Sequence, residues 1–138
     1  DGEEYHRLKK NIKNKNLDKA IFLLGRVNNV FKYMKLSEAF ILSSKWEEMG
    51  FVIIESALSN LFIISSNCPN GPTEFLNNGK NGILFENNQE DSLYHSMTKF
   101  SELTNPVKKK DILLLKKNSR KFTMFRHFKQ IDALLKLV

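Results

Sequence analysis

The chain has 138 residues, 41% of them apolar, and a net charge of +7, which suits one globular domain and excludes a disordered chain or a disulfide-stapled miniprotein. Its one cysteine, Cys68, has no partner for an internal disulfide or a zinc site, which favours a reducing compartment. No apolar run approaches the roughly 20 residues that cross a bilayer, and the N-terminus is acidic where a signal peptide is basic, so we expect a cytoplasmic protein.

Short apolar runs alternate with helical patterns over the first 85 residues. Charged helix formers with apolar residues three and four positions apart predict an amphipathic helix at residues 3–14. A continuous apolar run that ends at Gly25 predicts a buried strand at residues 20–24. This alternation is typical of βαβ units, so we expect an α/β fold with a parallel sheet covered on both faces. The further elements expected here are a helix at 30–36, a strand at 39–42, a helix at 51–58, a strand at 61–64, a short helix at 73–78 and a strand at 82–85.

After residue 85 the pattern indicates helices only. The turn pair Asn105-Pro106 is expected to separate the first two of them. Phe122, Phe125 and Phe128 continue in helical register towards the C-terminus, which predicts a core-facing stripe rather than a surface that stacks RNA bases. The expected helices lie at 89–103, 107–119 and 125–137.

The positive charge is confined to the C-terminal part of the chain. Residues 106–138 carry ten lysines or arginines against Asp111 and Asp132, a balance of +8, which leaves −1 for residues 1–105. The basicity therefore belongs to helices at 106–138 that pack on the domain, and not to the domain at 1–105 itself. The charge indicates either a solvated helix face or an interaction surface for acidic lipid headgroups or nucleic acid.

The most informative segment is a strand end, a loop and a helix start between residues 43 and 55. In open α/β sheets, ligands bind beyond the carboxyl ends of the strands, which is where this loop must lie. The helix start offers unpaired N–H groups and the positive end of a dipole, and Gly50 lets a ligand approach the backbone closely. These features predict a site for a phosphate or a diphosphate.

Two carboxylates in this segment have separate predicted uses. Glu47, in the loop, can accept hydrogen bonds from sugar hydroxyls, and Glu55, further into the helix, can bind both hydroxyls of a ribose cis-diol. Because carboxylates repel a diphosphate, they fit only if they face neutral hydroxyls on either side of it. The structural alternatives are a solvated loop acid at Glu47 and a surface helix residue at Glu55, although the apolar neighbours of Glu55 favour a buried helix. Trp46 is more readily a lid over the core than a stacking platform.

Other catalytic patterns have less support. His6, His95 and His127 lie far apart on predicted polar helices and are expected at the surface, without a nucleophile or a metal partner. Glycine-rich phosphate loops of the GxGxxG and GxxxxGK[ST] types are absent from the sequence. No metal site is therefore predicted.

This arrangement resembles that of family 4 glycosyltransferases, retaining enzymes of the GT-B fold within glycosyl transferases group 1. Their hallmark is a pair of glutamates separated by seven residues at a strand–loop–helix junction, and Glu47 and Glu55 have that spacing. The run WEEMGFVIIE is similar to the tryptophan-containing form found in bacterial polysaccharide and lipopolysaccharide enzymes. The segments that carry the resemblance are residues 1–2, 24–27, 39–44, 46–55 and 67–74.

The resemblance implies a Rossmann-like domain, followed by C-terminal helices, that binds a nucleotide diphosphate sugar in the C-terminal half of a GT-B enzyme. It implies transfer of a hexose or N-acetylhexosamine, with a UDP-sugar favoured, in cell-surface polysaccharide or glycan biosynthesis. No cofactor and no obligatory metal are implied. The implied donor-binding residues are Glu47 for the sugar, Glu55 for the ribose, the backbone at Gly50, Phe51 and Val52 for sugar and phosphates, and Arg26 and Val27 beside the base.

The resemblance covers only part of such an enzyme. The acceptor-binding N-terminal domain and the first two strands of the donor domain, with the basic loop that neutralises the leaving diphosphate, would precede Asp1. Without these parts we expect the chain alone to be inactive. In the family's strand order the two strands lie between the strands at 20–24 and 39–42, so we also expect the strand at 20–24 to lack a neighbour.

The resemblance also gives the basic tail a use. Acceptors of such enzymes are often glycans linked to lipid, and basic helices can hold a protein at the anionic inner face of the cytoplasmic membrane. This hypothesis includes no nucleic-acid partner. The alternatives are a non-catalytic α/β module that binds a nucleotide or nucleic acid through the basic tail, and a flavodoxin-like interaction domain.

Overall fold

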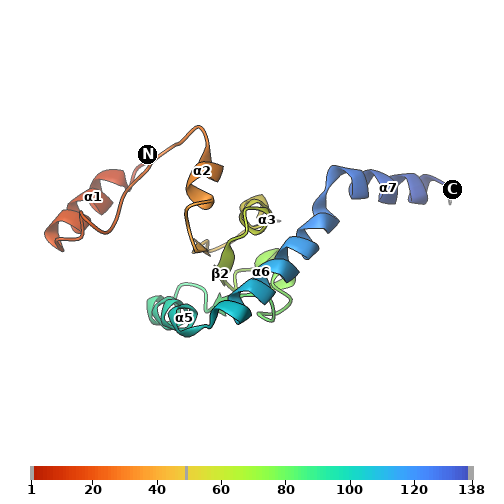
Figure 1. The fold of residues 1–138 in the computed structure, drawn as a ribbon. Helices are drawn as coiled ribbons and strands as arrows, with labels where there is room; N and C mark the ends of the chain where they lie inside the picture. Colours follow the sequence, from red (N-terminus) through yellow and green to blue (C-terminus); the bar gives the residue numbers. More distant parts are fainter. Residues whose placement is uncertain (1, 49, 137–138) are drawn as a thin grey trace. The chain divides into compact units, whose positions relative to one another are not determined.

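A computed structural model describes residues 2–48 and 50–136 of the chain (Figure 1). It divides into two compact units, residues 1–30 and residues 31–138. The first unit contains the helix α1 (Tyr5–Asn14), which confirms the amphipathic helix expected there. Tyr5 and Ile12 are half-buried while most other α1 side chains are exposed, as one apolar stripe on a charged helix requires.

The strand expected at residues 20–24 is not formed. This segment has no regular structure, and Phe22 exposes 69% and Leu24 52% of their surface. An apolar run becomes a strand only where a neighbouring strand pairs with its N–H and C=O groups. No described residue of the first unit supplies such a partner, because all the paired strands lie in the second unit.

The second unit is built on a parallel sheet in the order β1-β2-β3. The register pairs Leu42 with Ser65 and Ser66 with Phe85, so the three strands end at the same edge. All five residues of the central strand are buried, because helices cover both of its faces. The strands are β1 (Ala39–Leu42), β2 (Phe62–Ser66) and β3 (Ile83–Phe85).

Side chains that alternate along β2 join two separate clusters of the core. Ile63 packs with residues of α3, α4 and α6 on one face of the sheet, and Phe62 and Ile64 pack with residues of α5 on the other. This layering confirms the predicted α/β class (Figure 1). The helices are α2 (Val30–Met34), α3 (Phe51–Leu58), α4 (Pro72–Phe75), α5 (Glu90–Glu102), α6 (Asn105–Ser119) and α7 (Met124–Leu135), with a short 3-10 helix, η1 (Arg120–Phe122).

Helix α6 starts where a break was expected. Asn105 and Pro106 are its first residues, because proline lacks the N–H that an α-helix leaves unpaired in its first turn. Leu115 is fully buried against α3 and the sheet. Lys116 Nζ donates a 2.9 Å hydrogen bond to Oδ1 of Asn60, in the turn that leads from α3 to β2. These contacts fix α6 on one face of the core.

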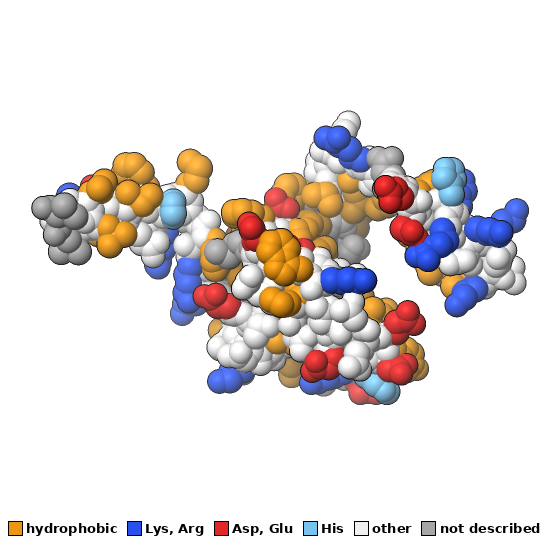
Figure 2. Space-filling view, turned by 180° about the vertical axis from the view of Figure 1, so that it is seen from behind, with side chains coloured by type: hydrophobic (Ala, Val, Ile, Leu, Met, Phe, Trp, Pro, Cys, Tyr) orange, Lys and Arg blue, Asp and Glu red, His pale blue; other side chains and the backbone are white. Residues whose placement is uncertain are grey.

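The stripe expected to face the core separates into two parts. Phe122 packs against Phe75, with ring centroids 5.8 Å apart. By contrast, Phe125 and Phe128 on α7 are exposed, and Figure 2 shows hydrophobic side chains along this helix at the left of the view. The prediction was wrong for α7, because an amphipathic pattern shows that a helix has an apolar face but does not show what covers it.

The contribution of α6 can be measured with two leucines two positions apart. Leu115 has no exposed surface and Leu113 is 67% exposed. We expect Leu115→Ala to lower the free energy of unfolding by about 2–5 kcal/mol, because it removes buried methyl groups and leaves a cavity. Leu113→Ala should change it by less than about 0.5 kcal/mol. Urea unfolding followed by circular dichroism measures both, and equal effects would show that α6 does not pack as described.

Candidate functional site

The candidate site lies at the edge where the strands of the second unit end. The loop that follows β1 leads to Gly50, whose backbone is left-handed with a φ of 60° and a ψ of 59°. Glycine adopts this conformation without a steric penalty, and it turns the chain directly into α3. Among the described residues, no side chain caps α3, so its first N–H groups keep their hydrogen-bonding capacity for another partner.

Glu47 lies beside this helix start. Its Oε1 accepts a 2.6 Å hydrogen bond from Ser44 Oγ. Its Oε2 is 3.7 Å from the position that a Cβ atom would take at Gly50, so a side chain there would be in contact with the carboxylate. Glu47 is half-buried. The carboxylate is therefore held at the start of α3, with one of its two oxygens occupied by a neighbour.

The loop that carries Glu47 is tied to the ends of the other two strands. Ser66, the last residue of β2, donates a 2.6 Å hydrogen bond from Oγ to the backbone oxygen of Ser44. Asn87, which follows β3, donates a 2.8 Å bond from Nδ2 to the backbone oxygen of Lys45. Neither residue was predicted from the sequence. The available signal was their position, because polar residues that follow neighbouring parallel strands meet at one edge of the sheet.

Glu55 lies in the middle of α3, one turn beyond its start. It is half-buried, and its neighbours Ile54 and Ser56 are buried, as the apolar pattern of this helix predicted. Among the described residues, no side chain forms an ion pair or a hydrogen bond with its carboxylate. A half-buried carboxylate without a protein partner can accept hydrogen bonds from a ligand.

The other predicted donor-binding residues have different surroundings. Val52 is half-buried against the core, and Phe51 exposes 69% of its surface. Their backbone groups begin α3, as the prediction requires. Arg26 and Val27 belong to the first compact unit, so their place beside a base stays a prediction. Trp46 is 59% exposed, and the expected lid over the core is therefore wrong.

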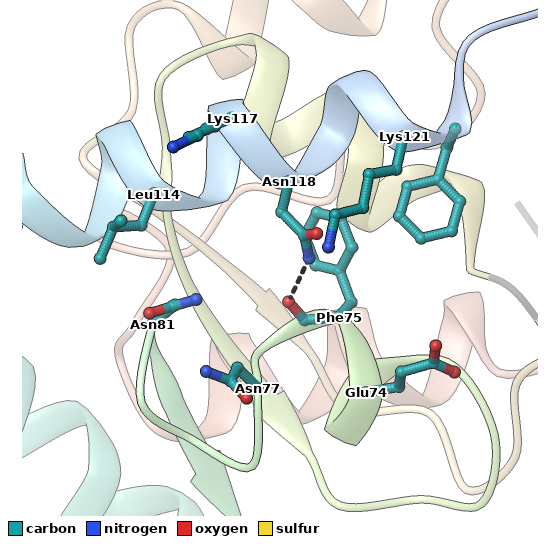
Figure 3. A pocket seen from close by; sticks show the side chains of 9 residues that line it. Glu74, Phe75, Asn77, Asn81, Leu114, Lys117, Asn118 and Lys121 are labelled. Carbon is teal, nitrogen blue, oxygen red and sulfur yellow. Dashed lines mark hydrogen bonds between the residues drawn. The ribbon is translucent and has the colours of Figure 1, made fainter. Parts of the chain in front are cut away.

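A separate hollow of about 360 Å³ lies between α4 and α6 (Figure 3). Asn118 Nδ2 crosses one side of it and donates a 2.9 Å hydrogen bond to the backbone oxygen of Phe75, which anchors α6 to the end of α4. Asn77 and Asn81 also line the hollow and precede β3 in the chain. They therefore lie towards the edge where the strands begin, away from Glu47.

Two further classes of feature are absent from the part of the chain that the structure describes. Residues 2–48 and 50–136 contain no group of three or more His, Cys, Asp or Glu side chains that could hold a metal ion. No helix within these ranges is both long and apolar enough to cross a membrane. The three histidines are exposed in the structure, as expected.

Comparison with known families agrees with this arrangement. The model of the family described as glycosyl transferases group 1 matches residues 1–122. The chain belongs to this family. As a group 1 glycosyltransferase it carries the strand–loop–helix junction of Glu47 and Glu55 at the carboxyl edge of a Rossmann-like sheet.

Three individual proteins illustrate the likeness. The chain is 35% identical over 103 residues to the UDP-Gal:alpha-D-GlcNAc-diphosphoundecaprenol alpha-1,3-galactosyltransferase of Escherichia coli, a match that covers 74% of this chain and 26% of that protein. A Rickettsia africae glycosyltransferase superposes with a TM-score of 0.83 at 24% identity, over 95% of this chain and 35% of that one. The structure of Anabaena HepE in complex with UDP superposes with a TM-score of 0.83 at 20% identity, over 96% of this chain and 36% of that one. These structures show the GT-B glycosyltransferase fold, of which the chain is one part.

The role of Gly50 can be separated from its conformation by a matched glycine. Gly79 also has a positive φ, of 78°, and a Cβ atom added there would make only ordinary contacts with Leu84. We expect Gly50→Ala and Gly79→Ala each to lower the free energy of unfolding by about 1 kcal/mol, because alanine is strained in this region.

Only Gly50→Ala should also weaken the binding of a nucleotide sugar, because its methyl group would stand beside Glu47 Oε2 at the helix start. Thermal unfolding and calorimetric titration with UDP-galactose and UDP-N-acetylglucosamine measure the two effects. Equal nucleotide-sugar binding by the two variants would contradict a ligand site at Gly50.

Proposed function

We propose that this chain is the donor-binding part of a retaining glycosyltransferase that uses a nucleotide diphosphate sugar. One observation carries the proposal: the start of α3 lies beside the half-buried carboxylate of Glu47, Glu55 follows on the same helix, and no described side chain caps the helix or bonds to Glu55. A helix start attracts a diphosphate, and carboxylates bind hydroxyl groups. A nucleotide sugar has hydroxyl groups on both sides of its diphosphate.

Electrostatics decide how such a donor would lie. The diphosphate would accept hydrogen bonds from the free N–H groups at Phe51 and Val52 and would be stabilised by the positive end of the α3 dipole. Glu47 would face the hydroxyls of the transferred sugar and Glu55 the ribose cis-diol, because either carboxylate would repel the phosphates. Arg26 and Val27 would flank the base.

A UDP-hexose or a UDP-N-acetylhexosamine is the proposed donor. The similar Escherichia coli enzyme is named for UDP-Gal and for a diphosphoundecaprenol acceptor, and the similar Anabaena structure contains UDP. We extend the proposal to a role in cell-surface polysaccharide or glycan assembly. The narrower assignment to family 4 within glycosyl transferases group 1 stays a prediction. The helix start supplies positive charge for the diphosphate, so donor binding is expected to persist in EDTA.

The remaining catalytic parts are proposed to lie outside these residues. The chain spans 26% of the length of the similar galactosyltransferase and about a third of the similar solved structures. We propose that residues 1–105 form part of the donor domain and that an N-terminal domain binds the acceptor. Transfer activity is accordingly expected from the intact enzyme and not from this chain alone.

The two glutamates should differ in their effect on UDP and on UDP-sugars. In the intact protein that contains this chain, we expect Glu55→Ala to lower the affinity for UDP and for UDP-sugars by about tenfold or more. The substitution removes hydrogen bonds between a charged group and the ribose. Glu47→Ala should weaken the binding of the UDP-sugar and leave the affinity for UDP unchanged. Calorimetric titration with UDP, UDP-galactose and UDP-N-acetylglucosamine, with and without EDTA, measures these effects.

Glu102→Ala on the exposed end of α5 is the control for these two variants and should bind all three ligands normally. If Glu55→Ala kept normal affinity for UDP, the donor-binding proposal would be wrong. RNA binding with a steep salt dependence that is indifferent to Glu55→Ala would support the nucleic-acid-binding module instead.

We also propose that the C-terminal helices lie at the anionic inner face of the cytoplasmic membrane, where a lipid-linked acceptor would be found. Exposed apolar residues of α7, among them Phe125 and Phe128, alternate with Arg126 and Lys129, a pattern typical of helices that lie in the membrane interface. Residues 106–138 remain strongly basic because ten lysines or arginines face only two acids there. Partial burial raises the pKa of the Asp111 carboxyl, against the opposite effect of Lys110, and Asp132 pairs with Lys136.

The membrane proposal predicts cosedimentation with phosphatidylglycerol vesicles that falls at high salt and is absent with neutral lipid. The double variant Arg126→Gln and Lys129→Gln should weaken it by about 2 kcal/mol, since each basic residue near the surface contributes about 1 kcal/mol. Its control is Lys13→Gln with Lys15→Gln, which removes the same charge from the first unit. Binding that is independent of salt and of anionic lipid would rule the proposal out.

A further inference from the structure

Hydrogen bonds connect the ends of all three strands to the carboxylate of Glu47. We call this set of bonds the edge network, and its members are Ser44, Lys45, Glu47, Ser66, Asn67 and Asn87. The Ser66 hydroxyl donates a hydrogen bond to the backbone oxygen of Ser44, and the Ser44 hydroxyl donates one to Oε1 of Glu47; each is 2.6 Å long. Because the carboxylate would contact the ligand, the network links the sheet to the site.

We propose that Ser44 is a positioning residue for the transferred sugar: it holds Oε1 of Glu47 and thereby directs Oε2 to the sugar hydroxyls. This inference rests on the proposed function, because it assigns a use to the free oxygen of Glu47. Ser44 itself needs no contact with the donor.

The bond from Ser44 restricts a side chain that is otherwise free to turn. A hydroxyl donor 2.6 Å from a carboxylate oxygen forms a short, charge-assisted hydrogen bond. The last torsion of a glutamate has broad minima, so without this bond the plane of the Glu47 carboxylate would turn readily and present its oxygens in other directions. With it, Oε2 stays beside Gly50, 3.7 Å from the place that a Cβ atom would take there, where glycine leaves room.

Ser44 is itself held by groups that belong to the sheet. Ser66 has no exposed surface, and its hydroxyl reaches the Ser44 backbone oxygen from the end of β2. Asn87 holds the next residue of the loop through the Lys45 backbone oxygen, over 2.8 Å. Asn67 Oδ1 accepts a 2.8 Å hydrogen bond from the Asn87 backbone N–H, which connects the loops after β2 and β3. The backbone of the loop is therefore fixed to the residues at the ends of β2 and β3.

The adjacent serine shows that this role is specific to one position. Ser43 is exposed, and no side-chain hydrogen bond from it is found among the described residues. Only Ser44 is directed towards Glu47, because successive residues of an extended segment point to opposite sides. A serine at either position has the same polarity, so composition alone does not distinguish them.

The experiment compares UDP with UDP-sugars in the intact protein, because only the sugar would contact Glu47. We expect Ser44→Ala to weaken UDP-galactose or UDP-N-acetylglucosamine, whichever the wild type binds more tightly, by about tenfold, and to change UDP affinity by less than about twofold. Ser44→Thr keeps the hydroxyl and should restore most of the sugar-dependent affinity. Ser101→Ala removes a serine hydroxyl that bonds only to the Thr98 backbone oxygen on α5, and it should behave as the wild type.

Each outcome separates this inference from the proposed function. A wild type that binds neither UDP nor a UDP-sugar would overturn both. If UDP-sugars bind and Ser44→Ala keeps the full sugar-dependent affinity, the positioning role is wrong while the donor site stands. An equal loss of UDP and UDP-sugar affinity would assign Ser44 to general loop stability and would also overturn the inference. Asn87→Asp, which removes the donor to the Lys45 oxygen, should reproduce the sugar-dependent loss in a smaller degree.

Discussion

The parallel pairing of β2 with a strand on each side is the constraint on which the rest of the structure depends. Because the strands run in one direction and Ser66 pairs with Phe85, the loops that follow them emerge at one edge. Residues more than forty positions apart, such as Lys45 and Asn87, can then share a hydrogen bond there. The same pairing buries β2 on both faces and brings α3 and α6 against the sheet.

The candidate site combines a positive helix start with two negative side chains. Gly50 allows the chain to enter α3 without a side chain at the point of closest approach. Glu47 is held beside that point by Ser44, and Glu55 follows a turn later on a helix whose other side is buried. Backbone N–H groups can therefore bind an anion and the carboxylates can bind hydroxyl groups. A nucleotide sugar contains both kinds of partner, a diphosphate and hydroxyls.

The two C-terminal helices show how one type of sequence pattern can have two outcomes. Both carry apolar and basic residues, yet α6 buries Leu115 in the core and α7 leaves Phe125 and Phe128 exposed. The difference lies in what each helix packs against. Helices α3 and α4 and the sheet contact α6 and, at its end, Phe122, and among the described residues their core contacts end there. A membrane surface is one partner with chemistry that suits the face of α7.

Local pattern determined much of this protein: apolar runs identified β1, β2 and β3 within two residues, and the bounds of α3 were predicted without error. Glu47, Gly50 and Glu55 were also selected as candidate site residues from local features, because charge, glycine and a helix start are properties of neighbouring residues; their roles stay predictions. Tertiary structure alone decided that residues 20–24 form no strand, that α7 stays exposed and that Ser66 and Asn87 bond to the loop that carries Glu47. Those outcomes depend on which surfaces and strand ends meet in space, and hydropathy and spacing along the chain carry no information about a partner that is distant in sequence.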